Sequence, residues 1–121
     1  MIENLFDLIG GRQTIEAATE RFYEKVLKDD NLRHFFGETD MAHLRSRQAM
    51  FICMLLGGGV YTGKDVHDAH ALARNEGLND GHFDSFLQHF RAALEEEGVK
   101  PENTEEIMKR LKRKRGAVLE T

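Results

Sequence analysis

A histidine at position 70 stands where a helix would turn its apolar side inward. Val66, Ala69, His70 and Ala73 follow the i, i+3, i+4, i+7 spacing of one helical stripe. A buried imidazole needs a partner, because an unsatisfied buried polar group costs about 1–3 kcal/mol. Two interpretations follow: a core histidine satisfied by its neighbours, or the ligand of a metal or cofactor. Periodicity alone favours the first.

Two further polar side chains lie on or beside apolar stripes. Tyr23 lies beside the apolar face of a helix predicted over residues 13–28, and Gln48 falls within the stripe of the following long helix. If both face the space near His70, they form a site with an imidazole on one side and polar groups on the other. The alternatives are a Tyr23 that packs in the core with its hydroxyl at the surface, and an exposed Gln48.

The metal chemistry open to His70 is restricted by what surrounds it. His67 and His70 are spaced i, i+3 and could chelate one metal, but a zinc site needs further ligands, and the chain has a single Cys and no His-Glu-x-x-His pattern. Paired Glu-x-x-His motifs for a di-iron site are also absent from the sequence. A haem needs one axial imidazole, an apolar envelope and a distal side of defined polarity, and eight Phe and five Met help to supply the envelope.

Composition places the chain among ordinary globular proteins. It has 121 residues, of which 40% are hydrophobic and 31% are charged, so we expect a single domain spanning 1–121. One Cys excludes an internal disulfide, and no apolar run approaches the roughly 20 residues of a membrane span. The first residues lack the basic region of a signal peptide, so we expect a cytoplasmic protein with no membrane partner.

A strongly basic run lies near the C-terminus although the net charge is −4. Six cations occupy the seven positions 109–115. The run is either a contact for an anionic partner or a solvated helix end whose cations oppose the negative dipole terminus. The acidic balance and the lack of interleaved aromatic residues weigh against nucleic-acid binding.

The elements that must position these residues are all predicted to be helical. Proline occurs only at Pro101, and no alternating Val, Ile or Thr pattern suggests a sheet. Glycine pairs and Asp- or Asn-rich turns separate the periodic segments. We predict helices over 1–9, 13–28, 32–36, from a cap at Thr39 or Asp40 to Leu56, around His70, from a cap at Asn79 or Asp80 to before Gly98, and from Pro101 onward.

The order of several short motifs resembles one known family, the group 1 truncated haemoglobins. No single motif is specific, but together they run from about Leu5 to Leu119 with the family's spacing. These motifs are Gly10-Gly11, Phe22-Tyr23, Phe35-Phe36, Thr39-Asp40-Met41, Gln48, Gly57-Gly58, Ala69-His70, His82-Phe83-Asp84, Glu102-Asn103-Thr104 and Lys114 to Leu119.

The resemblance implies an all-α fold, a two-over-two helical sandwich around haem. It makes His70 the proximal iron ligand, Tyr23 the distal tyrosine that donates to the iron-bound ligand, and Gln48 the inward polar residue of the distal helix. Phe35 or Phe36 takes the place of the aromatic that wedges the haem. The full set implied to contact haem is His70, Phe35, Phe36, Leu44, Arg47, Phe51, Val66, Tyr61 and Phe83.

Three positions depart from other members of the family. Leu44 occupies the distal gate where many members carry Gln, which removes one donor. Arg47 stands where some members have an iron-binding His, and an always-protonated Arg serves a haem propionate better. Members with covalently tethered haem use a His near the C-terminus, whereas no His follows His89 here. The resemblance therefore implies non-covalent haem b.

The function implied is reversible binding of oxygen, nitric oxide and carbon monoxide by a monomer. Such a centre stores oxygen, or lets bound oxygen oxidise nitric oxide to nitrate with electrons from an unidentified reductase. The alternative from another class is a cofactor-free helical interaction module that presents its basic C-terminal helix to an acidic partner.

Overall fold

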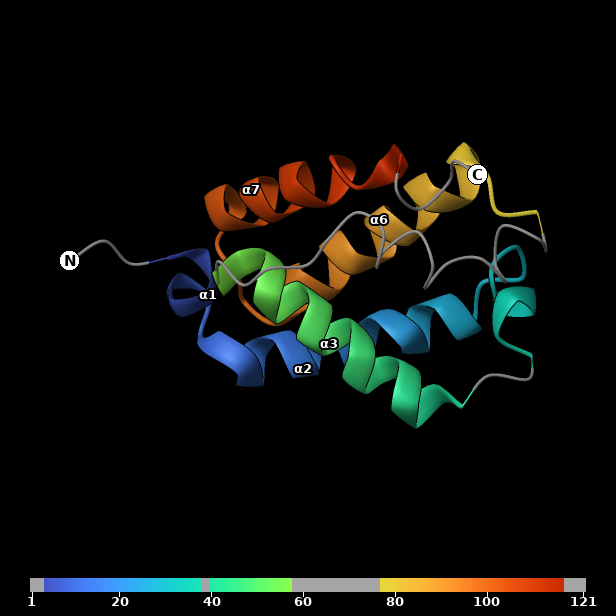
Figure 1. Ribbon diagram of the computed structural model, residues 1–121, viewed down its shortest axis with the longest axis horizontal. Coiled ribbons are helices and arrows are strands. Elements are labelled where there is room, and N and C mark those ends of the chain that lie inside the picture. Colours follow the sequence, from blue (N-terminus) through green and yellow to red (C-terminus); the bar gives the residue numbers. More distant parts are fainter. Residues whose placement is uncertain (1–3, 38–39, 58–76, 117–121) are drawn as a thin grey trace.

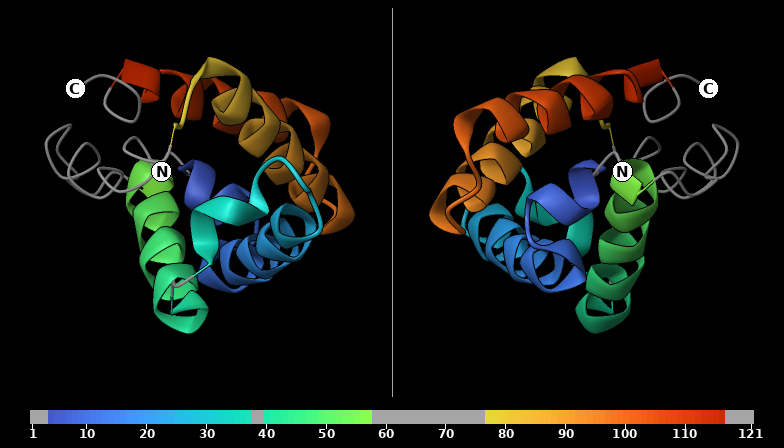
Figure 2. Two further views of the ribbon diagram at one scale, coloured as in Figure 1. Left: turned by 90° about the vertical axis from the view of Figure 1, so that its right-hand side faces the viewer. Right: turned by 90° about the vertical axis from the view of Figure 1, so that its left-hand side faces the viewer.

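The computed structural model describes residues 4–37, 40–57 and 77–116, and no strand occurs in these ranges. The main helices form two pairs, α2 with α3 and α6 with α7, and α2 also packs against α6 (Figure 1; Figure 2). None of the helices described is both long and apolar enough to cross a membrane. In chain order the elements are α1 (Leu5–Leu8), α2 (Gly11–Leu27), η1 (Arg33–Phe36), α3 (Met41–Gly57), α6 (Asp80–Glu96) and α7 (Pro101–Lys112).

Helix α2 confirms the stripe predicted for it but begins two residues earlier, at Gly11. Ile15, Ala18 and Val26 are fully buried on its inner face. The early start follows from Gly10, whose φ of +106° makes the tight turn from α1. A Cβ at Gly10 would also lie 2.4 Å from the Thr14 hydroxyl oxygen, so glycine is required there.

Helix α3 is apolar on more than one face. The side chain of Asp40 caps its first turn by accepting from the His43 backbone N–H at 3.2 Å, which confirms one of the two predicted caps. The face that packs most deeply carries Ala49, Ile52 and Leu56. On the predicted stripe Phe51 is buried, whereas Met41, Leu44, Gln48 and Leu55 are half-buried. The core face of α3 therefore lies beside the predicted stripe.

Helices α6 and α7 close the other side of the core. Asn79 caps α6 as predicted, and Phe90, Ala93 and Leu94 are buried on its inner face. Helix α7 starts with Pro101 after the cap residue Lys100, and its Ile107, Met108 and Leu111 join the same core. Val118 and Leu119, at the end of the Lys114-to-Leu119 motif, lie outside the described residues.

Candidate functional site

Tyr23 lies deep between the packed helices and is 3% exposed. Burial raises the pKa of its phenol well above the ordinary value, and the charge of Arg45 on α3 acts weakly in the opposite direction. The phenol is therefore a neutral hydrogen-bond donor at any physiological pH. The burial contradicts the alternative in which the hydroxyl reaches the surface.

Tyr23 belongs to a cluster of aromatic rings from three elements. Its ring lies 4.8 Å from Phe22 and 5.8 Å from Phe36, both edge-to-face. Phe86 on α6 lies 6.1 Å from Phe22 and 6.0 Å from Phe36. Each such pair contributes about 0.5–1.5 kcal/mol beyond its burial. The cluster therefore fixes η1 against α2 and α6, at the place where a ring-shaped apolar group would find aromatic walls.

Phe35 and Phe36, the two candidates for the aromatic wedge, face different neighbours. Both are half-buried. Phe36 contacts Tyr23, whereas the ring of Phe35 lies 5.0 Å from His82 and 6.2 Å from Phe86. Phe36 is thus the one in direct contact with the predicted distal tyrosine.

The α3 side of the site mixes apolar and cationic groups. Leu44 and Gln48 are half-buried, and the burial of Gln48 contradicts the alternative in which its side chain is exposed. Arg47 is exposed. Arg45 is half-buried, and its Nε is buried with no hydrogen-bond partner in the part of the chain that is described. A buried donor left unpaired is costly. Aromatic walls, a neutral phenol and an unpartnered guanidinium N–H therefore fit an apolar ring system that carries acceptors.

Phe83 lies in the first turn of α6, beneath a guanidinium. It is 8% exposed, and Cζ of Arg115 lies 4.8 Å from the centre of its ring. The predicted site residues Tyr61, Val66 and His70 lie outside the described residues, as does His67.

Comparison with known proteins decides the family. Residues 4–120 match the family model of the bacterial-like globins. A group 1 truncated haemoglobin of Synechocystis sp. is 39% identical over 100 residues, which cover 81% of each chain. One of Tetrahymena thermophila is 40% identical over 96 residues, covering 78% of this chain and 77% of the relative. The chain belongs to the group 1 truncated haemoglobins.

Solved structures of truncated haemoglobins share the fold. The Fe(III) form of the protein from Tetrahymena pyriformis has a TM-score of 0.86 and 36% identity, covering 97% of this chain and 98% of that one. The 2/2 haemoglobin of Synechococcus sp., in the cyanomet state and with covalently attached haem, has a TM-score of 0.90 and 32% identity, covering 98% and 100%. The predicted two-over-two sandwich is confirmed.

Membership of this family also settles the class of function. As a truncated haemoglobin, the chain is a haem protein that binds gases such as oxygen. The cofactor-free interaction module is not favoured.

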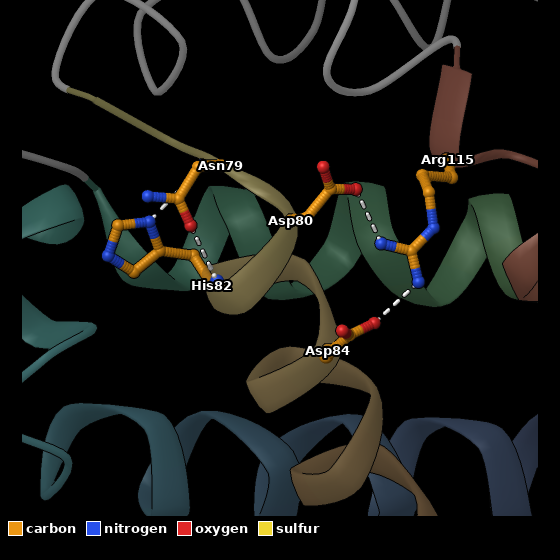
Figure 3. Close-up of polar contacts among 5 residues, drawn as sticks. All are labelled: Asn79, Asp80, His82, Asp84 and Arg115. Atoms are coloured by element: carbon orange, nitrogen blue, oxygen red, sulfur yellow. Dashed lines mark hydrogen bonds and ion pairs between the residues drawn. The ribbon is translucent and has the colours of Figure 1, made fainter.

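Two histidines of this truncated haemoglobin have partners that the sequence analysis does not name. His82 is half-buried: its backbone N–H donates to the Asn79 side chain at 3.1 Å, and its Nδ1 accepts from the Asn79 backbone N–H at 3.2 Å (Figure 3). His89 is half-buried beside Asp29, 2.8 Å away. Asn79-x-x-His82 has the spacing of a capping box, with His in place of the usual Glu or Gln, so the sequence contained a signal for the position of His82. Asp29 and His89 are sixty residues apart, and the sequence contains no signal that they are partners.

Cys53 and part of the basic run have structural surroundings. Cys53 is half-buried, and burial raises the pKa of its thiol, which makes it less reactive. Arg110 donates to the backbone oxygen of Leu55 at 3.3 Å, and Arg115 pairs with Asp80 and Asp84. At least two of the six cations of the basic run therefore have hydrogen-bond or ion-pair partners within the chain.

Proposed function

We propose that this truncated haemoglobin holds haem b through His70 and that Tyr23 and Gln48 are the polar groups that face a bound gas. The observation that carries the proposal is the desolvated phenol of Tyr23 among aromatic rings of α2, η1 and α6. A tyrosine buried only for packing gains nothing from placing its hydroxyl beside a cation-bearing helix. A tyrosine that serves a gas ligand needs a neutral donor in a dry place.

The chain's own residues have distinct parts in this proposal. Haem bound by these residues would supply an iron that takes oxygen, nitric oxide or carbon monoxide. Tyr23 keeps its proton on Oη, because burial disfavours the phenolate. A hydrogen bond to an acceptor with partial negative charge is of the stronger kind in a water-poor site. Tyr23 and Gln48 would therefore favour oxygen, which takes up negative charge on binding, over carbon monoxide.

The remaining predicted contacts divide into apolar walls and one rim cation. Arg47 is exposed on α3, which suits a residue that reaches a carboxylate at the solvent edge of the cofactor. Buried Phe51 and half-buried Leu44 lie on the same helix. The walls are assigned to Phe35, Phe36, Leu44, Phe51, Tyr61, Val66 and Phe83.

Haem attachment is proposed to be non-covalent. The Synechococcus relative carries covalently attached haem, but no histidine follows His89 in these 121 residues. Extraction with acidified butanone should move all haem into the organic phase. Haem that stays with the polypeptide would overturn this part of the proposal.

Oxygen binding is the activity proposed first, and oxidation of nitric oxide to nitrate uses the same site. Conversion of nitric oxide and oxygen to nitrate takes up one further electron per turnover, so this second activity would need a reductase. The family match over 4–120 supports a single globin domain spanning 1–121. We propose that this domain acts as a cytoplasmic monomer.

The test is the absorption spectrum of the purified protein from cells supplied with haem. We expect a red protein with a Soret band that shifts on reduction and again on addition of carbon monoxide. A pyridine haemochrome assay gives the haem-to-chain ratio. A colourless protein that also fails to bind added haemin would overturn the proposal and favour the interaction module.

A further inference from the structure

Arg115, from the basic run, reaches three residues in the first turns of α6. Its Nη1 donates to Asp80 at 2.7 Å and its Nη2 donates to Asp84 at 2.5 Å (Figure 3). Its Cζ lies 4.8 Å from the centre of the Phe83 ring. One guanidinium therefore joins two carboxylates and an aromatic face. The planar fork of Arg suits this arrangement, whereas the point charge of Lys does not.

The two carboxylates need this cation. Asp80 and Asp84 are spaced i, i+4 on one helix face, and like charges at this spacing destabilise a helix. The guanidinium between them turns the repulsion into two ion pairs. It also lies over Phe83, whose ring face attracts a cation by about 0.5–1 kcal/mol at an exposed site.

The Arg115 contact lies at the start of α6, and a second arginine forms a similar ion pair further along the same helix. Arg91 on α6 pairs with Glu105 on α7, and within the described residues its ion pair and hydrogen bond involve no residue proposed for the haem site. All three ion pairs of these two arginines tie α6 to the C-terminal part of the chain, and in each the arginine is partly exposed and the carboxylate is exposed. The two arginines differ in that Arg115 alone contacts Phe83.

We propose that Arg115 is a positioning residue for haem: it fixes Phe83 at the start of α6 and so sets how the haem is seated. The proposal rests on the proposed function, in which Phe83 contacts haem. The proposal gives Arg115, which belongs to the basic run, a role within the folded chain and not in contact with an acidic partner.

The experiment compares Arg115→Gln with the matched control Arg91→Gln, each as the haem-loaded full chain. One readout is the rate of haem transfer to excess apomyoglobin. The other is the ratio of the two haem orientations in the proton NMR spectrum of the ferric cyanide complex. Thermal unfolding of both apoproteins shows how much general stability each substitution removes.

We expect Arg115→Gln to raise the haem transfer rate about threefold or more and to shift the orientation ratio, in line with the loss of a cation–π contact and two surface ion pairs. Arg91→Gln should leave both readouts near those of the unchanged protein while lowering stability similarly. Arg115→Lys should restore the charge but only part of the orientation ratio. High salt should reduce the Arg115→Gln effect, since exposed pairs are screened.

The variant Phe83→Leu distinguishes a failure of this proposal from a failure of the proposed function, in which Phe83 contacts haem. If Phe83→Leu changes both haem readouts while Arg115→Gln matches Arg91→Gln, Arg115 is not a positioning residue. If Phe83→Leu leaves both readouts unchanged in a haem-binding protein, Phe83 does not contact haem and the positioning role falls with it. If neither the unchanged protein nor any variant binds haem, the proposed function itself is overturned.

Discussion

His89 Nε2 donates to Asp29 Oδ2 across 2.8 Å and joins α6 to the turn that follows α2. The other carboxylate oxygen of Asp29 accepts from the Asn31 backbone N–H at 2.9 Å. These two bonds, the His89 bond first, hold the pKa of Asp29 below its ordinary value. The ionised carboxylate thus fixes the turn between Tyr23 on α2 and the phenylalanines of η1.

Asp29→Asn should lower the free energy of unfolding by about 1 kcal/mol at neutral pH, the scale of a partly buried charged hydrogen bond. Because the folded state lowers the pKa of Asp29, its contribution is full above the ordinary aspartate value of 3.8 and is lost as pH falls through the lower folded value. Urea unfolding at pH 7, 5 and 3 measures the difference between the two proteins. That difference should shrink only toward the most acidic condition.

The exposed neighbour Asp30 provides the control for this substitution. It pairs with Arg33 at 3.2 Å on the surface, so Asp30→Asn should change stability little. A loss from Asp29→Asn that persists undiminished in strong acid would show a packing effect in place of an ionic one.

His70→Ala should abolish stable haem retention, with partial recovery on addition of imidazole. The expectation rests on the apolar stripe that carries His70 and on the family match. Gel filtration followed by the haem-to-protein absorbance ratio measures retention. His43→Ala is the control, because His43 is exposed on α3. An unchanged ferrous spectrum for the His70 variant would make His67 the next candidate.

Local sequence patterns predicted the helices well where one face differs clearly from the others. On α2 the polar residues between Ile15, Ala18 and Val26 define a single inner face. On α3 the run from Phe51 to Leu56 is apolar on every side, so periodicity could not choose between the Leu44 stripe and the Ile52 face that packs in the core. A cofactor beside the Leu44 stripe, as proposed above, would explain in physical terms why both faces are apolar.

Ion pairs and hydrogen bonds between residues far apart in the chain could not be predicted from the sequence. Nothing in the spacing of Asp29 and His89 marks them as partners, and the acceptors of Arg115 lie more than thirty residues away. The basic run therefore left two interpretations open, a contact for an anionic partner or a solvated helix end. The structure places Arg115, just after the end of α7, against Asp80 and Asp84 of α6.

Tyr23 should ionise in the apoprotein only well above the ordinary range of a phenol. The chain contains only Tyr23 and Tyr61, and burial raises the pKa of Tyr23 above its ordinary value of 10.0. Titration followed at the phenolate absorption band should show a high-pH component that vanishes in Tyr23→Phe. If Tyr23→Phe instead removes a component near the ordinary value, the phenol is solvated and is not the desolvated donor proposed.

Tyr23→Phe should speed oxygen dissociation roughly tenfold or more, because a hydrogen bond to a charged acceptor is worth about 1.5–3 kcal/mol. Gln48→Leu should act in the same direction. Carbon monoxide takes up less charge, so its dissociation should respond much less. Stopped-flow ligand replacement measures both gases. Equal effects on the two gases would mean that these side chains act by sterics.

The ferrous protein without gas should be five-coordinate and high-spin. Leu44 and Arg47 occupy the positions from which relatives were expected to supply a distal ligand, and neither side chain binds iron. His43 precedes Leu44 and points roughly 100° away from it on the helix, and its exposure agrees with that direction.

In the ferric state water or hydroxide should take the sixth position, with Tyr23 as donor or, at high pH, as a competing ligand. Resonance Raman spin-state markers test both states. Two strong nitrogen ligands in the ferrous form would require His43 to turn inward or α3 to rotate, and would overturn the prediction.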